Sequence, residues 1–360
     1  MNVEIETPRD EEAIVEAVLF YDTVNAGRAA RWEASRDLQV PMLTGESPFA
    51  KEREICPFVA RQAGEIVARG VAVVDPVYNR HWNDRLGHLA WFEAMPEAEE
   101  AARLLVDQAC AWLADRGMHA ARTGFCIGLL DLPLAMDEYE TLPPGILRQN
   151  PPYYHRMLKR IGFEVEKGFV DYKLQVTPEL QASWASSLEG ARNAGFEIVP
   201  LGELDPAQRV NDLTNTWSDT FKTHWGWVPL KDEELALLLD ENADTSILDT
   251  SCMAYLDGEA AGFLWNPSED PDEAILLPGR TLDDSEKLNA LSIGVRERAR
   301  GRGLNYAMAG FSYLELASRG WTHLSYTLVL DDNWSSRRTG EGLGAKVCAN
   351  YLAYRRNLRR

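Results

Sequence analysis

The residues best suited to chemistry lie in one segment, 295–304, with the sequence Val-Arg-Glu-Arg-Ala-Arg-Gly-Arg-Gly-Leu. Its four arginines carry positive charge and hydrogen-bond donors that suit phosphate oxygens. Gly301 and Gly303 let the backbone turn tightly and approach a ligand closely. A helix that begins after the loop adds free N–H groups and the positive end of its dipole. The segment therefore predicts a site for a phosphorylated ligand, with a solvated, arginine-rich turn as the structural alternative.

Two elements must hold this loop, namely a buried-type strand over 288–295 and an amphipathic helix over 304–318. The helix has its apolar residues on one face, at the period of an α-helix. The loop lacks the Gly-Lys-Ser/Thr ending of a P-loop, and Tyr306 stands where a dinucleotide fingerprint needs its third glycine. The segment therefore belongs to neither of these two classes of phosphate-binding loop.

The remaining elements are predicted from apolar periodicity and from glycine turns. In the second half we expect strands over 196–200, 252–256, 260–265, 324–330 and 345–354, and helices over 206–222, 231–240 and 334–342. In the first half we expect a hairpin over 57–76, strands over 88–92 and 163–174, and a helix over 97–116.

The two halves of the chain resemble each other. Three stretches recur in the same order: 60–65 matches 254–259, 114–117 matches 317–320, and 161–172 matches 343–354. The spacing of the matches places about 21 extra residues in the first half within 124–149, a proline-containing stretch that indicates an inserted loop. A duplicated chain is predicted, and two unrelated α/β domains are the alternative.

The segment 298–303 fits the pattern [QR]-x-x-G-x-[GA], and the chain here resembles the GNAT superfamily of N-acetyltransferases, which has this pattern between its fourth strand and third helix. Downstream, Asn333 and the stretch 343–345 stand where the family has further landmarks, the latter in place of a common Gly-Phe pair. The first half, from Asn150 to Phe163, resembles the same landmarks.

The resemblance implies an α/β (α+β) fold of two tandem GNAT-like domains, each a mixed, mostly antiparallel twisted sheet flanked by helices. We expect a degenerate domain at 1–178, a linker at 179–195, and a GNAT domain with the acyl-CoA site at 196–360. The first half has no glycines after its strand at 88–92, and four carboxylates stand where a pyrophosphate would lie. Because like charges repel, that half is not expected to bind coenzyme A.

The resemblance also implies the residues that hold an acyl-CoA, with acetyl-CoA as the expected form. Amides of 300–304 would hold the pyrophosphate, while Gly294 and Val295 would pair with pantetheine and polarise the thioester carbonyl. Asn333 would contact the pantetheine arm or only cap the helix that follows it. The implied coenzyme residues are Gly294, Val295, Arg298, Arg300, Gly301, Arg302, Gly303, Leu304 and Asn333.

The catalytic residues are less defined. Many GNAT enzymes protonate the leaving thiolate with a tyrosine at a position that Gly340 occupies here. The remaining candidates are His224 as a base, with Ser292 and Tyr326 on neighbouring strands. Trp225 and Trp227 would form an apolar wall for the acceptor. Packing alone is the structural alternative for His224, for Tyr326 and for the two tryptophans.

Composition excludes several classes of partner. The chain has 37 Lys+Arg against 56 Asp+Glu, a net charge of −19, which disfavours nucleic acids and anionic membrane surfaces. We find no apolar run long enough to cross a membrane and no signal-peptide pattern. The five cysteines are scattered and no metal-ligand spacing occurs, so a cytoplasmic protein without a metal site is expected. Oligomeric state stays open.

The resulting prediction is an acyl-CoA-dependent N-acyltransferase that acts on a small amine in the second half of the chain. The alternative is a GNAT-fold protein without acetyl transfer. It would act as a ligand sensor, or would take an acyl group from a carrier protein or an aminoacyl-tRNA. Docking such a carrier would need a basic patch, for which the terminal arginines Arg355, Arg356, Arg359 and Arg360 are candidates.

Overall fold

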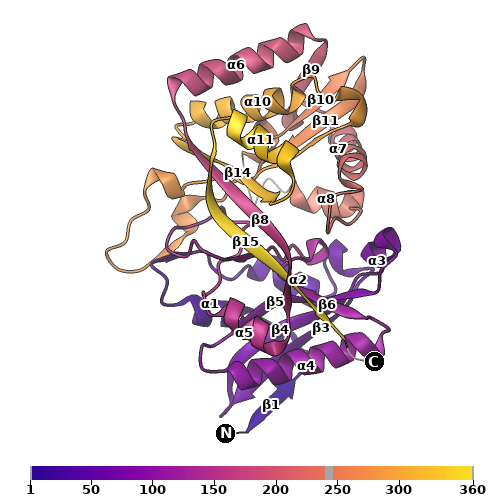
Figure 1. Ribbon diagram of the computed structural model, residues 1–360, viewed down its shortest axis with the longest axis vertical. Helices are drawn as coiled ribbons and strands as arrows, with labels where there is room; N and C mark the ends of the chain where they lie inside the picture. The colour runs from indigo at the N-terminus through magenta and orange to yellow at the C-terminus, as the bar shows by residue number, and fades with distance from the viewer. Residues whose placement is uncertain (1, 240–245, 359–360) are drawn as a thin grey trace.

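The computed structural model describes residues 2–239 and 246–358 (Figure 1). Arg359, Arg360 and the last residue of the helix predicted at 231–240 lie outside these ranges. The first half contains β1 (Val3–Glu6), α1 (Glu11–Asn25), β2 (Ala30–Arg31), α2 (Arg36–Thr44), β3 (Glu54–Gln62), β4 (Glu65–Val74), α3 (Pro76–Trp82), β5 (Leu86–Ala94), α4 (Glu99–Asp115), β6 (Ala120–Thr123), β7 (Leu134–Ala135), α5 (Tyr154–Ile161) and β8 (Glu164–Gln175).

The second half begins with a long helix that packs on α10. Its elements are α6 (Pro178–Asn193), β9 (Phe196–Pro200), α7 (Pro206–Phe221), α8 (Asp232–Leu238), α9 (Ile247–Thr250), β10 (Cys252–Leu256), β11 (Glu259–Trp265), β12 (Ile275–Leu276), β13 (Ser292–Val295), α10 (Leu304–Ser318), β14 (His323–Leu330), α11 (Trp334–Gly342) and β15 (Lys346–Asn357). None of the helices within the described residues is long and apolar enough to cross a membrane.

The strands form two large sheets. The larger has the order β1-β3-β4-β5-β6-β15-β8-β14, with β7 paired to β15, and the smaller has the order β13-β11-β10-β9. Within them every pairing is antiparallel except that of β5 with β6. The predicted class, a mixed and mostly antiparallel α/β fold, is therefore confirmed.

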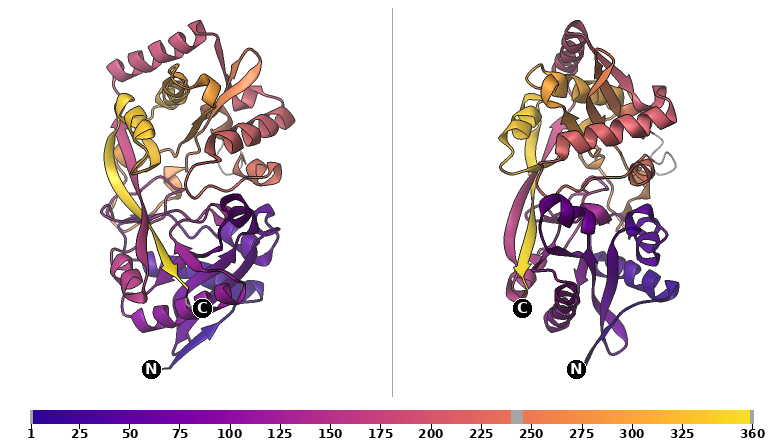
Figure 2. Two further views of the ribbon diagram at one scale, coloured as in Figure 1. Left: turned by 45° about the vertical axis from the view of Figure 1, so that its right-hand side comes forward. Right: turned by 90° about the vertical axis from the view of Figure 1, so that its right-hand side faces the viewer.

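The two halves exchange their last strands. β8 ends the first half but pairs with β14 of the second, while β15 ends the second half and pairs with β6 of the first. The two exchanged strands also pair with each other, from Lys346 opposite Lys173 to Arg355 opposite Glu164. They run side by side across both halves in all views (Figures 1 and 2). A continuous sheet therefore joins the halves.

The repeated stretches adopt matching backbone conformations. The turn of the β3–β4 hairpin has positive φ at Ala63 and Gly64, and the turn of the β10–β11 hairpin has positive φ at Asp257 and Gly258. The glycines after the two matched helix pairs are also left-handed, at φ 78° for Gly117 against 90° for Gly320, and at 99° for Gly162 against 95° for Gly344. Left-handed caps of this kind end helices where only glycine fits well.

Two stretches differ from the prediction. Residues 179–195, expected as a linker, lie largely in α6, which packs on α10 through Trp184. The strand expected over 288–295 is shorter, because only 292–295 pair with β11. Before them, the side chain of buried Asn289 bonds Asn266 Oδ1 at 2.8 Å and accepts from the Ser325 amide at 2.9 Å. These bonds turn 288–291 away from regular pairing.

Candidate active site

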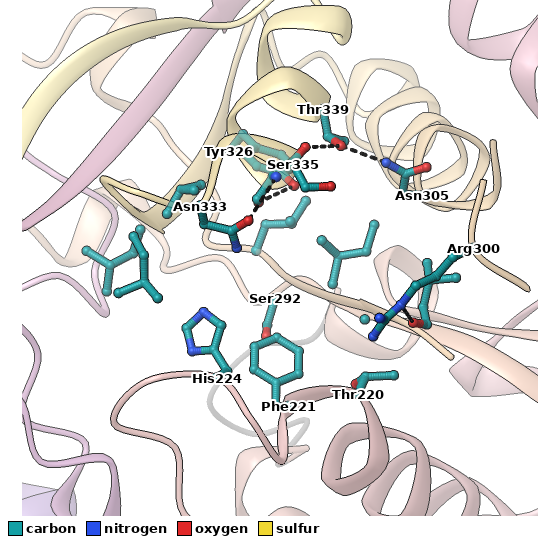
Figure 3. A pocket seen from close by; sticks show the side chains of 18 of the residues that line it. Thr220, Phe221, His224, Ser292, Arg300, Asn305, Tyr326, Asn333, Ser335 and Thr339 are labelled. Atoms are coloured by element: carbon teal, nitrogen blue, oxygen red, sulfur yellow. Dashed lines mark hydrogen bonds between the residues drawn. The ribbon is translucent and has the colours of Figure 1, made fainter. Parts of the chain in front are cut away.

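A cavity of about 680 Å³ opens between β13 and β14 in the second half. The two strands belong to different sheets, so their facing edges are not paired with each other. Figure 3 shows Ser292 and His224 facing Tyr326 and Asn333 across this space, with Arg300 at one end. The cavity therefore lies in a gap between two splayed strands, and residues of α7, α10 and α11 also line it.

Asn289 fixes the point where the strands separate. Its side chain accepts from the Ser325 amide and donates to the Ser325 carbonyl at 3.3 Å, so it bridges to β14 where a paired strand would otherwise lie. Beyond this bridge, β14 bulges at Thr327 and Leu328, with a positive φ of 51° at Leu328. Both bulge residues line the cavity.

The loop from 296 to 303 forms the end of the cavity where an anion would lie. Gly301 and Gly303 have φ of 75° and 76°, in the left-handed region that residues other than glycine rarely adopt. The first helical hydrogen bond of α10 runs from Ala307 to the Gly303 carbonyl, so the amides of 304–306 have no acceptor within the helix. Gly301 and Leu304 line the cavity beside them.

The four arginines of this loop point in different directions. Arg300 lines the cavity, and its Nε donates to the Val295 carbonyl at 3.1 Å. Arg298 donates to the Ala260 carbonyl at 3.1 Å, and Arg302 donates to Ala194 at 2.8 Å while lying 4.5 Å from the Phe196 ring centre. Arg296 is held by Ala260 and by Asp219. Of the three arginines that were predicted, only Arg300 lines the cavity.

Gly294 and Val295 lie on β13 and line the cavity, as does Ser292. A Cβ on Gly294 would collide with Thr220 Oγ1 of α7 and with the Phe263 ring. The glycine therefore allows α7 to approach β13 closely, a packing reason that exists beside any role toward a ligand.

Asn333 caps a helix and also lines the cavity. Its side-chain oxygen accepts from the Ser336 amide at 3.2 Å, which caps α11. The residue also lines the cavity, and Figure 3 shows its amide nitrogen directed toward the open space.

His224 lies in the loop after α7, against the ring of Phe221 at 5.1 Å between centres. Burial lowers the pKa of its imidazole below the ordinary value. Lys167 lowers this pKa further, whereas Asp332 opposes the shift. The ring is therefore neutral at pH 7 and able to accept a proton.

Tyr326 lies directly beside Gly340 of α11. A Cβ on Gly340 would lie 3.1 Å from Tyr326 Cδ1, so β14 places a phenol beside α11. Its hydroxyl is 3.0 Å from Ser336 Oγ. Burial raises the pKa of Tyr326 to about 12, which keeps the phenol protonated.

The two tryptophans of the predicted acceptor wall separate. Trp225 lines the cavity and packs in an aromatic cluster, tilted against Phe125 and edge-on to Phe169. The Arg122 guanidinium lies 4.2 Å from its ring centre. Trp227 is buried outside the cavity lining, and its carbonyl accepts from Trp82 Nε1 at 2.7 Å. Packing therefore accounts for Trp227.

Sequence reasoning missed Lys167 and Asp332. Lys167 lies on β8, the exchanged strand of the first half, and its Nζ is 2.5 Å from Asp332 Oδ2 at the edge of the cavity. The residues are 165 positions apart, so no local spacing could join them. The first half therefore contributes a charged group to the site of the second.

The corresponding region of the first half is filled by its own insertion. β5 bulges at Trp91, with φ 49°, and the Trp91 amide is bonded by the Asp131 carboxylate. Arg148 donates to the Phe92 carbonyl and to Glu93. Asp131 and Arg148 both belong to the predicted insertion 124–149. The strand backbone that would serve a ligand is thus already bonded by the protein.

The carboxylates expected to repel an anion in the first half are instead mostly paired. Glu93 binds Arg148 and is buried, Glu99 binds Arg160, and Glu100 binds Arg103. In the first half, residues of the insertion occupy the region beside the bulge of β5. This occupation, rather than repulsion by free carboxylates, is what distinguishes the region from the cavity of the second half.

Comparison with known proteins gives distant relatives. No family model matches the chain. It is 21% identical over 208 residues to protein YghO of Escherichia coli, a match that covers 58% of this chain and 53% of YghO, about half its length. It is 25% identical over 335 residues to the bacterial ceramide synthase of Caulobacter vibrioides, covering 87% of this chain and 86% of that protein.

Solved structures resemble the whole chain. A tandem GNAT protein from the clavulanic acid biosynthesis pathway superposes with a TM-score of 0.61 at 10% identity, covering 100% of this chain and 99% of that one. A GCN5-related N-acetyltransferase from Sphaerobacter thermophilus superposes with a TM-score of 0.54 at 13% identity, covering 99% of this chain and 96% of that one. The chain therefore has the tandem GNAT fold.

Proposed function

We propose that this tandem GNAT-fold chain is an acyl-CoA-dependent N-acyltransferase that transfers its acyl group to an amine in the cavity between β13 and β14. The observation that carries the proposal is the arrangement at one end of that cavity. There, Arg300, the left-handed Gly301 and the first residues of α10, Leu304 and Asn305, line one space. Helix N-termini with such loops bind phosphate groups.

The residues of the cavity fit coenzyme A along its length. Gly301, Leu304 and Arg300 would hold the pyrophosphate, and Val295 and Asn333 would accompany the pantetheine arm. The bound coenzyme supplies an acyl group activated as a thioester. The side chains of Phe221, Leu291, Ile293 and Leu328 supply apolar contacts and exclude water near the reacting atoms.

Proton transfer is assigned to two groups on opposite walls. His224 is neutral at pH 7 and would accept the proton of the attacking amine, directly or through water. Tyr326 keeps its proton and would donate a hydrogen bond to the leaving sulfur. A thiol has an ordinary pKa of about 8.5, so a hydrogen-bond donor suffices to assist its departure.

A second candidate concerns the acceptor. The relative that covers most of the chain is a ceramide synthase, a name that denotes N-acylation of an amino lipid. Several lining residues are apolar, which suits a long-chain amine as well as a small one. The second candidate is therefore N-acylation of a long-chain amino alcohol by a long-chain acyl-CoA.

The test is thiol release from acetyl-CoA and from palmitoyl-CoA, each with a panel of small amines and with a long-chain amino alcohol. Turnover with small amines supports the first candidate, and turnover only with the long-chain pair supports the second. Binding of coenzyme A without release of thiol by any pair would favour a ligand sensor. Absence of both binding and turnover would contradict the proposal.

The arginines provide a matched pair of variants. Arg300→Ala removes the guanidinium that lines the cavity and should raise the KM for acyl-CoA about tenfold. Arg302→Ala removes the same charge from the same loop, but its guanidinium bonds Ala194 and lies by Phe196. Equal effects of the two variants would show that the loop acts only through its overall charge.

A further inference from the structure

The cavity between β13 and β14 has a second region, away from the loop that we assign to the pyrophosphate. In Figure 3, His224 lies well away from Arg300, with Ser292 between them. The residues that line the cavity near His224 come from the loop after α7, from β14 and its end, and from β8: Trp225, Leu328, Leu330, Asp332 and Lys167. Both halves of the chain therefore contribute to this region.

Trp225 is held firmly in this wall. Its ring is tilted against Phe125, at 5.2 Å between centres, and edge-on to Phe169 at 5.8 Å. The Arg122 guanidinium lies 4.2 Å from the ring centre, and it is buried and donates to both oxygens of Glu166 at 2.7 and 2.9 Å. The indole therefore separates the cavity from Phe125 and Phe169, which lie outside the cavity lining.

The wall around Trp225 is apolar. Leu330 lies opposite Phe169 in the pairing of β14 with β8. Leu328, Leu330 and Trp225 all pack in one hydrophobic cluster with Phe125 and Phe169. An aliphatic group placed against this wall would be removed from water, which favours binding by about fourfold for each methylene.

The charges near the wall compensate each other. Lys167 Nζ lies 2.5 Å from Asp332 Oδ2, with the Lys167 side chain 17% exposed and that of Asp332 65% exposed. Because each charge has the other as its partner, this pair does not select a charged substituent. The region instead suits an amine whose substituent is apolar.

The position of His224 decides which substrate meets this wall. His224 is assigned to accept the proton of the attacking amine, so the nitrogen of that amine must come within hydrogen-bond reach of the imidazole, directly or through water. The substituent on the nitrogen then extends along the neighbouring wall. We propose that the acceptor is an amine with an aliphatic chain that lies against Trp225 and Leu330, and that Trp225 limits the length of this chain. This inference rests on the proposed function, which gives His224 its role.

The probes are n-alkylamines from butylamine to decylamine, titrated calorimetrically into the full chain at constant ionic strength and without coenzyme A. Affinity should rise about fourfold for each methylene until the chain reaches Trp225, and should then level off. In Trp225→Ala the ring is removed, so the rise should continue for at least about two further methylenes.

Two further variants make the comparison decisive. Trp225→Phe keeps an aromatic ring against Phe125 and Phe169, so it should fold and should extend the rise by less than Trp225→Ala. It also decides the matter if Trp225→Ala does not fold. The control is Trp334→Ala, because Trp334 is 58% exposed, lies outside the cavity lining and packs on Arg337. This control should keep the native dependence on chain length.

Three results would overturn the inference. They are alkylamines that do not bind, a dependence on chain length that is unchanged in the folded Trp225 variants, and an equal change in Trp334→Ala. A second series, of acyl-CoA esters from acetyl to decanoyl, tests the other source of a chain. A change confined to that series would show that the wall holds the acyl group and not the amine. Absence of thiol release with every pair would contradict the proposed function, whereas the amine titrations still decide the role of Trp225.

Discussion

At the scale of single residues, Tyr326 of β14 places its phenol against the helix that contains Gly340. Its ring fills the space beside Gly340, and its hydroxyl reaches Ser336 on the same helix. A side chain added at Gly340 would therefore press against Tyr326, a contact that the sequence could not reveal because it depends on the neighbouring strand.

Tyr326→Phe tests whether this hydroxyl assists the leaving group. If it does, kcat should fall by about 100-fold while the KM for acyl-CoA changes little, since proton donation acts in the transition state. The measurement is thiol release. The control is Tyr306→Phe, which removes a hydroxyl that donates to the Arg338 carbonyl. An equal loss in Ser336→Ala would instead assign Tyr326 a positioning role.

His224 makes a prediction about pH. Burial lowers its pKa, so the protonated and inactive ring forms only in acid, and kcat/KM should fall as pH decreases through that lowered pKa. Lys167→Met removes a cation that lowers this pKa, so the acid limb should move to higher pH. Asp332→Asn removes the anion that raises it, so the limb should move to lower pH. Identical profiles in all three proteins would exclude His224 as the base.

The loop arginines mark the limit of sequence reasoning at this scale. The local sequence pattern predicts glycine turns at Gly301 and Gly303 and a helix that begins at Leu304. The structure has a left-handed glycine at both positions and a helix from Leu304. The directions of Arg298 and Arg302 depend on the carbonyls of Ala260 and Ala194, which approach from distant segments. The direction of a side chain depends on tertiary contacts that the local sequence does not specify. Counting the arginines of the loop therefore overstates the positive charge that lines the cavity.

At the scale of elements, the bulge of β14 depends on one carboxyl group of β8. Asp171 Oδ1 accepts from the Leu328 amide at 3.2 Å and from Ser325 Oγ at 3.4 Å, inside the sheet. Burial raises the pKa of Asp171 to about 7, against its ordinary value of 3.8. The exchanged strand therefore shapes the bulge that lines the cavity.

Asp171→Asn tests the cost of this arrangement. The folded state keeps a proton between about pH 4 and 7 that the unfolded state releases, so stability due to this group is complete below pH 4 and is lost as pH rises toward 7. The amide cannot ionise. Above pH 7 the variant should therefore gain up to about 4 kcal/mol in unfolding free energy relative to the native chain.

The measurement is urea unfolding at pH 4, 6 and 8, with exposed Asp249→Asn as the control. A stability difference that does not grow with pH would contradict the raised pKa of Asp171. The KM for acyl-CoA need not change in Asp171→Asn, because the side-chain oxygen of the asparagine can still accept from the Leu328 amide.

Elements with strong local patterns were predicted well, and those that rely on tertiary contacts were not. The helices at 304–318 and 334–342 have the predicted bounds. α6 was missed because its buried side chains are only Trp184 and Ala191, too few to make an apolar face. The end of the strand before Ser292 was missed because Asn289 bonds across to Ser325 with its side chain.

At the scale of the whole molecule, the duplication was predictable but the exchange of strands was not. A period-two pattern identifies β8 and β15 as strands, yet it does not specify which neighbours they pair with. As a result, a fragment such as 1–180 would lack β15, which lies between β6 and β8. Ligand binding should therefore be measured on the full chain, and the predicted boundaries at 178 and 195 stay proposals.

The halves are also joined by a buried ion triad. Arg53 Nε lies 2.7 Å from Asp75 Oδ2, and Arg53 Nη1 lies 2.7 Å from Glu234 Oε1 of α8. All three side chains are at most 3% exposed. Removing one partner of such a set leaves charge buried without compensation, which typically costs about 3–5 kcal/mol.

Glu234→Ala should therefore lower the free energy of unfolding by about 3–5 kcal/mol in urea, measured by tryptophan fluorescence and circular dichroism. The adjacent Glu233→Ala is the matched control, because its carboxylate pairs with exposed Lys51 and should contribute less than about 1 kcal/mol. Because the triad and the exchanged strands both cross between the halves, the two probes should give one shifted transition in Glu234→Ala. Two separate transitions, with only one displaced, would show that the halves unfold independently and that the continuous sheet does not couple them.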